Sequence, residues 1–129
     1  MKLLFTYALV ASLTTFSSFT DQSEIEHVIS ALNTGDAIEL AKYFDENVEL
    51  ALPDKNDNYS RAQALLILKD FFSNNGIKSF EVKHKGEQEG GQFCIGTLQT
   101  RAGNFRTTVF MKMKAKKQVV KEIRFQAIE

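Results

Sequence analysis

Residues 60–76 read SRAQALLILKDFFSNNG, and from residue 78 onward the sequence changes to alternating polar and apolar side chains. The first stretch predicts a helix with its own start and stop signals. Ser60 and Gln63 have the spacing of a capping box, and Gly76 suits the left-handed residue that closes a helix. The alternation that follows has the period of a β-strand. Helices first and strands second predict segregated layers, an α+β fold.

Two further helix starts lie upstream of this helix. Residues 23–26 (SEIE) and 36–39 (DAIE) both have the capping-box spacing, so we expect the first side chain of each to cap a helix. Gly35 is placed to end the first of these helices. In the second, the periodicity puts Ile38, Ala41 and either Leu40 or Phe44 on the inner face.

The segment between the second and third helices predicts one strand and one loop. Residues 47–52 alternate as a short strand that Pro53 ends, and residues 53–58 are polar, as in a loop. The helix over residues 60–76 is apolar nearly all round, so we expect other elements to enclose it.

Four strands are readable after residue 77. In the first, Phe80, Val82 and His84 share one face by simple alternation. In the third, Phe110 shares the outward face with Lys112 and Lys114, which we expect to lie in solvent. The sequence therefore predicts three N-terminal helices packed in a curved, mainly antiparallel sheet of four to six strands.

The N-terminus has the pattern of a secretory signal peptide. Lys2 supplies a positive charge, residues 3–13 form a short apolar stretch, and residues 17–20 are rich in small side chains. The apolar stretch is too short for a membrane span, so we expect no integral membrane anchor. The predicted organisation is a signal peptide over residues 1–20 and one domain over residues 21–129, in a periplasmic or secreted protein.

Composition argues against several classes of function. The chain has 129 residues, with 16 basic and 16 acidic side chains. Such a balance gives no long-range field to attract nucleic acid. The two histidines, at positions 27 and 84, have no metal-ligand spacing, and the sequence predicts no metal and no cofactor. Cys94, in a strand pattern, is best interpreted as a small buried apolar residue.

Several segments resemble the nuclear transport factor 2-like superfold, which is also called cystatin-like. They are residues 32–36 (LNTGD), 40–44 (LAKYF), 59–64 (YSRAQA), 70–72 (DFF) and 95–98 (IGTL). The last three resemble a family of exported Gram-negative bacterial proteins of unknown function. The resemblance implies a cone-shaped sheet around a long helix. It does not imply one activity, because this fold hosts isomerases, dehydratases, cyclases and binding modules.

Our leading hypothesis is an exported binding or interaction module that is not an enzyme. A small apolar ligand would lie in the cone between the third helix and the sheet; a protein partner is the other option. The residues predicted to line this space are Phe44, Leu68, Phe72, Phe80, Val82, Phe105, Val109 and Phe125. The same side chains can instead fill the cone as core, since pockets and cores use the same residue types.

Two alternatives use other residues. An enzyme of the isomerase, dehydratase or cyclase type would use His84 as a base and Tyr43 as a hydrogen-bond donor, although a histidine at a strand end also suits a solvated rim. A homodimer would pair through the sheet face around Phe110, because an aromatic residue is unexpected on an outward face.

Overall fold

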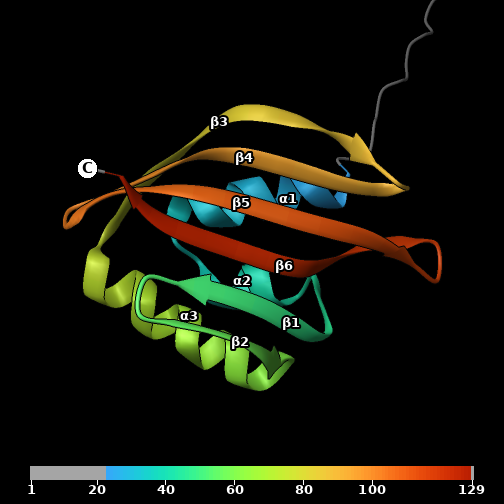
Figure 1. The fold of residues 1–129 in the computed structure, drawn as a ribbon, viewed down its shortest axis with the longest axis horizontal. Helices are drawn as coiled ribbons and strands as arrows, with labels where there is room; N and C mark the ends of the chain where they lie inside the picture. Colours follow the sequence, from blue (N-terminus) through green and yellow to red (C-terminus); the bar gives the residue numbers. More distant parts are fainter. Residues whose placement is uncertain (1–22, 129) are drawn as a thin grey trace, which may run out of the picture.

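The computed structural model describes residues 23–128, and the predicted signal peptide lies outside this range (Figure 1). Three helices and six strands follow one another along the chain. They are α1 (Glu24–Thr34), α2 (Ala37–Ala41), β1 (Phe44–Leu52), β2 (Lys55–Ser60), α3 (Arg61–Asn75), β3 (Ile77–Gln88), β4 (Gly91–Thr100), β5 (Gly103–Lys114) and β6 (Lys117–Ile128).

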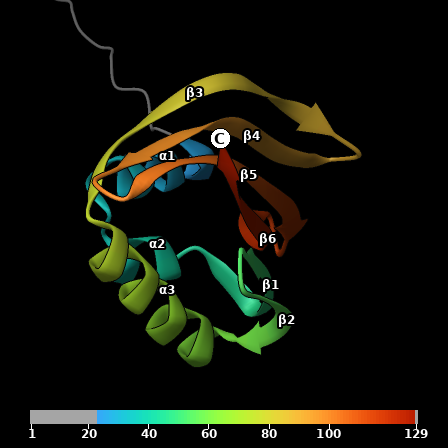
Figure 2. The same cartoon turned by 60° about the vertical axis from the view of Figure 1, so that its left-hand side comes forward.

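The strands form a single curved sheet in the order β2-β1-β6-β5-β4-β3. All neighbours are antiparallel except β1 and β6, which run parallel. Figure 2 shows the three helices on the concave side of this sheet. The predicted α+β architecture is confirmed, with the sheet at six strands.

Side-chain capping is present at two of the three predicted helix starts. At α3, Ser60 Oγ accepts from the Gln63 backbone N–H at 3.2 Å, and Gln63 Oε1 accepts from the Ser60 N–H at 3.2 Å. At α2, Asp36 Oδ1 accepts from the Glu39 N–H at 3.0 Å. At α1 the prediction was wrong: the Ser23 side chain makes no capping bond, and only its backbone carbonyl accepts, from the Glu26 N–H at 3.0 Å.

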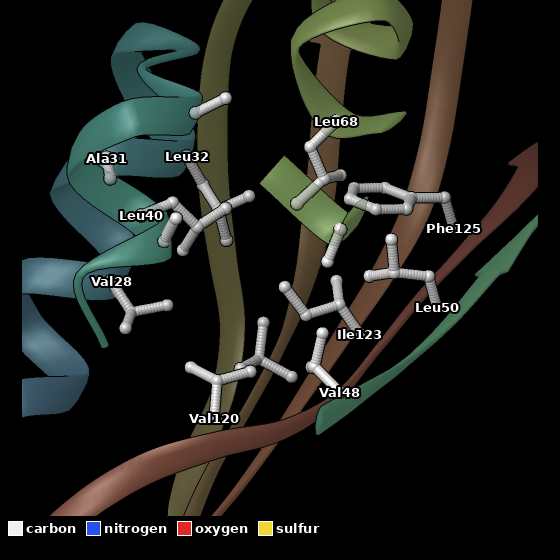
Figure 3. Packing of buried hydrophobic residues seen from close by; sticks show 14 of the residues in the cluster. Val28, Ala31, Leu32, Leu40, Val48, Leu50, Leu68, Val120, Ile123 and Phe125 are labelled. Atoms are coloured by element: carbon white, nitrogen blue, oxygen red, sulfur yellow. The ribbon is translucent and has the colours of Figure 1, made fainter. Parts of the chain in front are cut away.

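The core fills the space between the helices and the concave face. Figure 3 shows α1 and α2 contributing Val28, Leu32 and Leu40 to the same cluster as Val120 and Phe125 of β6. All five side chains are buried. Burying a side chain of this size stabilises the fold by about 1.5–3 kcal/mol relative to leaving it in water.

The structure corrects the prediction for residues 44–58. The first strand begins at Phe44, three residues earlier than expected, and the predicted polar loop over residues 53–58 is largely strand β2. Only the turn at Pro53 and Asp54 separates the two strands. Residues of β2 are mostly exposed because it is an edge strand with β1 as its neighbour. Pairing with β1, and not local propensity, makes it a strand.

Two predictions of buried helix faces were wrong in part. In α2, Leu40 and Ala41 face the core as predicted, together with Ala37, but Ile38 is 57% exposed. The helix α3 is not enclosed all round: its buried stripe leaves Leu66 65% exposed. The helical spacing of the buried residues in α3, i, i+4, i+7 and i+8, explains why Leu66 lies outside the stripe.

Candidate functional site

The residues predicted to line a pocket lie in the core. Seven of the eight are buried in the core cluster, and Val82 is half-buried against it. Aromatic packing is close at the end of the cone nearest α3: the Phe71 ring lies 5.2 Å from that of Phe105 and 4.8 Å from that of Phe125, centroid to centroid.

A pocket opens where this aromatic cluster reaches the surface. It has a volume of about 470 Å³ and lies between α3, the turn that joins β1 to β2, and β5. We call it the mouth pocket. Its apolar lining consists of Leu52, Pro53, Leu66, Ile67, Phe71 and Phe105. Phe105 is therefore the predicted lining residue that the structure places in this pocket.

Polar side chains complete the lining of the mouth pocket. Asp54 and Lys55 come from the β1–β2 turn, and Asp70, Asn74 and Asn75 come from α3. Asn74 Nδ2 donates to Asp70 Oδ2 at 3.3 Å, and Asn75 Nδ2 donates to the backbone carbonyl of Phe71 at 2.8 Å. Within residues 23–128, Asp54, Lys55 and Asp70 take part in no ion pair. Asp54 and Lys55 are therefore available to a ligand, whereas Asp70 already accepts the hydrogen bond from Asn74.

Sequence reasoning missed most of this pocket. The apolar pattern of residues 60–76 predicts that Leu66 is enclosed, and the polar pattern of residues 53–58 gives Asp54 and Lys55 no role. The signal for Leu66 was present in the helical spacing, which leaves it outside the buried stripe. No local signal indicates that the β1–β2 turn comes next to α3, since that contact depends on how α3 packs against β1 and β2.

His84 lies on the opposite face of the sheet from the one predicted. Val82 pairs with Gly96, but His84 pairs with Ile95, so Lys83 is an extra residue in β3. Such a β-bulge reverses the alternation beyond it. His84 is therefore exposed on the convex face, while Lys85 turns inward and pairs with Glu26 of α1.

Tyr43 is not brought together with His84. Its ring stacks on His27 of α1 at a centroid distance of 5.5 Å, and it packs against the core. Its backbone carbonyl accepts from the Val120 N–H at 2.7 Å, which joins the end of α2 to β6. Tyr43 thus lies on the concave side with the helices, and His84 lies across the sheet from it.

Phe110 lies on the convex face, as its alternation predicted. It pairs with Phe93 of β4 and with Glu122 of β6, and it is half-buried. The Phe93 ring also lies 5.5 Å from the His84 ring, centroid to centroid. The convex face therefore carries a row of rings across three strands.

Lys112 and Lys114 are not simply solvated. Lys112 Nζ lies 2.8 Å from Asp45 Oδ2, and Lys114 Nζ donates to Asp45 Oδ1 at 2.7 Å. These hydrogen bonds, first from Lys112 and then from Lys114, hold the pKa of the Asp45 carboxyl well below its ordinary value. These three residues, the Asp45 cluster, connect the start of β1 to the end of β5 across β6. The two lysines neutralise the charge of the Asp45 carboxylate.

Cys94 is a buried free thiol in β4, as the sequence predicted. Burial raises its pKa to about 12, so the reactive thiolate is scarce at neutral pH.

No group of three or more potential metal ligands is assembled among residues 23–128. In the same part of the chain, no helix is long and apolar enough to cross a membrane.

Comparison with known proteins places this geometry in a family. The profile of a domain of unknown function, DUF4783, matches residues 25–126. A crystal structure of a DUF4783 family protein from Bacteroides uniformis is 34% identical, with a TM-score of 0.80; the match covers 83% of this chain and 99% of that one. No curated protein matches the chain significantly.

More distant structures share the fold alone. An NTF2-like protein of unknown function from Cytophaga hutchinsonii is 12% identical, with a TM-score of 0.60, over 85% of this chain and 95% of that one. A domain with a cystatin-like fold from Nostoc punctiforme is 12% identical, with a TM-score of 0.63, over 81% of this chain and 73% of that one. The chain therefore belongs to the DUF4783 family of domains of unknown function and has an NTF2-like fold.

Proposed function

We propose that this protein is a non-catalytic binding module that holds a small, mainly apolar ligand in the mouth pocket. The observation that supports this most strongly is the pocket itself. Its volume of about 470 Å³ falls in the range of small-molecule sites, and it joins an apolar lining to a few polar groups, as such sites do. Phe71 and Phe105 are largely buried and form the apolar base of the pocket, while the exposed side chain of Leu66 offers apolar surface to the ligand.

Two arrangements support a binding role over catalysis. An acid–base mechanism needs its groups within reach of one substrate, and His84 and Tyr43 lie on opposite sides of the sheet. Two lysines keep the buried carboxylate of Asp45 ionised, and its ion pairs with them connect β1 to β5. A general acid would instead need its pKa raised.

Substitution of one exposed side chain tests whether the mouth pocket binds an apolar ligand. The probe is N-phenyl-1-naphthylamine, an uncharged dye that fluoresces in apolar surroundings. We expect Leu66→Gln to weaken dye binding about fivefold, since it removes roughly 1 kcal/mol of apolar contact. Met113→Gln is the matched control, because Met113 is 57% exposed and lies outside this pocket. No fluorescence increase with the unmodified protein, or equal effects of both variants, would refute the proposal.

We also propose that the protein is exported and acts outside the cytoplasm. The support is the signal pattern of residues 1–20: Lys2, the apolar stretch over residues 3–13 and the small residues after it. N-terminal sequencing of the protein from expressing cells should give a first residue near position 21. A protein that retains Met1 and stays in the cytosol would rule out export.

A second candidate function is a homodimeric interaction module that uses the convex face. The observation in its favour is the half-buried row formed by Phe93 and Phe110. We expect Phe110→Glu to shift sedimentation from dimer to monomer. Leu66→Glu, a charge at an exposed site on α3, should leave the dimer intact. A protein that is monomeric before any substitution removes this candidate.

A further inference from the structure

A second hollow lies on the convex face, away from the mouth pocket. It has a volume of about 470 Å³ and is formed by β3, β4, β5 and the end of β6. We call it the basic hollow. Its lining consists of Lys83, His84, Ile95, Gly96, Thr97, Arg106 and Ile128.

The β-bulge in β3 builds this hollow. Regular alternation would place His84 on the concave side opposite Cys94, but the extra residue Lys83 moves it to the convex side opposite Ile95. Gly96 sits across from the bulge. A Cβ there would collide with the carbonyl oxygen of Glu81, so the strands approach closely only because this residue is glycine. Bulges often serve to re-aim a side chain beside a binding or active site.

The charges in the basic hollow have one sign. Lys83, His84 and Arg106 are its ionisable lining residues, and the lining contains no carboxylate. Lys83 lies 3.3 Å from Glu81, in a pair that is largely exposed. Arg106 has no ion pair within the part of the chain that the structure describes. Its guanidinium is therefore available for an anion, to which it can donate two parallel hydrogen bonds.

Apolar side chains lie beside these charges. Ile95 is half-buried, and Ile128 is 48% exposed although it lies at the end of a strand in the middle of the sheet. The His84 ring packs near Phe93, which limits its freedom. The hollow thus combines an apolar floor with basic groups at its edge.

We infer that the basic hollow is a second binding site, which takes an anionic amphiphile: a carboxylate, or an anion of similar shape, on a short apolar chain. Arg106 binds the anionic head, Lys83 adds positive potential, the His84 ring can donate a hydrogen bond to the head, and Ile95 and Ile128 contact the chain. A second copy of the protein fits this hollow less well. Pairing across a two-fold axis through it would bring the basic groups of both copies together.

Nuclear magnetic resonance on the ¹⁵N-labelled protein tests this inference with decanoate as the probe. We expect decanoate to shift the backbone amides of Ile95, Thr97, Arg106 and Ile128. Decyltrimethylammonium, which has the same chain and the opposite charge, should leave them in place. Arg106→Gln should weaken decanoate binding about tenfold.

The matched control is Arg124→Gln. Arg124 is exposed on the same face but pairs with Glu122 and does not line the hollow, so its loss should leave decanoate affinity within twofold. Three results would overturn the inference. These are equal shifts with both amphiphiles, equal affinities of the two arginine variants, and shifts of these amides with protein concentration alone, which would identify a second copy as the occupant.

Discussion

At the scale of single residues, the pairing between strands decides which face of the sheet a candidate site residue occupies. His84 shows this best: its sequence neighbours predict the concave side, and a single extra residue, Lys83, puts it on the convex side. No local pattern marks a bulge of this kind, because the bulge depends on how β3 meets β4. Cys94, by contrast, was predicted correctly, since its burial follows from simple alternation within one strand.

The Asp45 cluster gives a prediction about acid stability. Its pKa is lowered in the folded protein, so ionised Asp45 stabilises the fold above the ordinary aspartate pKa of about 4. This contribution is lost as the pH falls below that value toward the lower folded pKa. Asp45→Asn should therefore cost about 1 kcal/mol at pH 7 and much less at pH 2.

Urea denaturation at the two pH values measures this difference. Glu49→Gln is the control, because Glu49 is an exposed carboxylate on the same strand with no ion pair in the described chain. It should change stability little at either pH. A cost of Asp45→Asn that does not depend on pH would mean that the ion pairs contribute nothing.

At the scale of elements, helix boundaries were predicted well, whereas strand β2 and part of the inner face of α2 were not. The boundaries of α3 follow from Ser60 and Gly76, two residues that act through their immediate neighbours. Strand β2 was missed because its residues have low strand propensity and depend on β1 for their hydrogen bonds. Ile38 was misplaced because α2 is only five residues long, too short for its periodicity to define a face.

The helix starts offer a comparison within one protein. Ser60→Ala removes a side-chain cap and should lower the free energy of unfolding by about 1 kcal/mol. Ser23→Ala removes no side-chain bond at α1 and should cost less than about 0.3 kcal/mol. Chemical denaturation of both variants checks this. Equal costs would show that the capping bond at Ser60 does not stabilise α3.

At the scale of the whole molecule, the sequence predicted the helix and sheet layers but not the pockets that form where elements pack together. The α+β order and the buried aromatic residues follow from composition and period, and the curved sheet is what the family resemblance implies. The mouth pocket and the basic hollow do not, because each is lined by side chains from several elements whose packing against one another no local pattern specifies. The proposed functions therefore rest on surfaces that only the assembled fold brings together.

Protection of backbone amides should follow the strand order. Strands β5 and β6 lie inside the sheet and carry Val109, Ile123 and Phe125 into the core, whereas β2 is an exposed edge strand. We expect hydrogen exchange to be slowest in β5 and β6 and fast in β2. Exchange followed by nuclear magnetic resonance measures this directly. Protection of β2 equal to that of β6 would contradict the expected order.

The parallel pairing of β1 with β6 affects how the protein is made. In chain order, β6 is the last of the six strands, and it joins β1 and β2 to the meander of β3, β4 and β5. Until those twelve residues emerge, the nascent chain consists of two groups of strands with unsatisfied edges. Native closure must therefore wait until β6 has been synthesised, which leaves the strand edges of the growing polypeptide open to chaperones before that point.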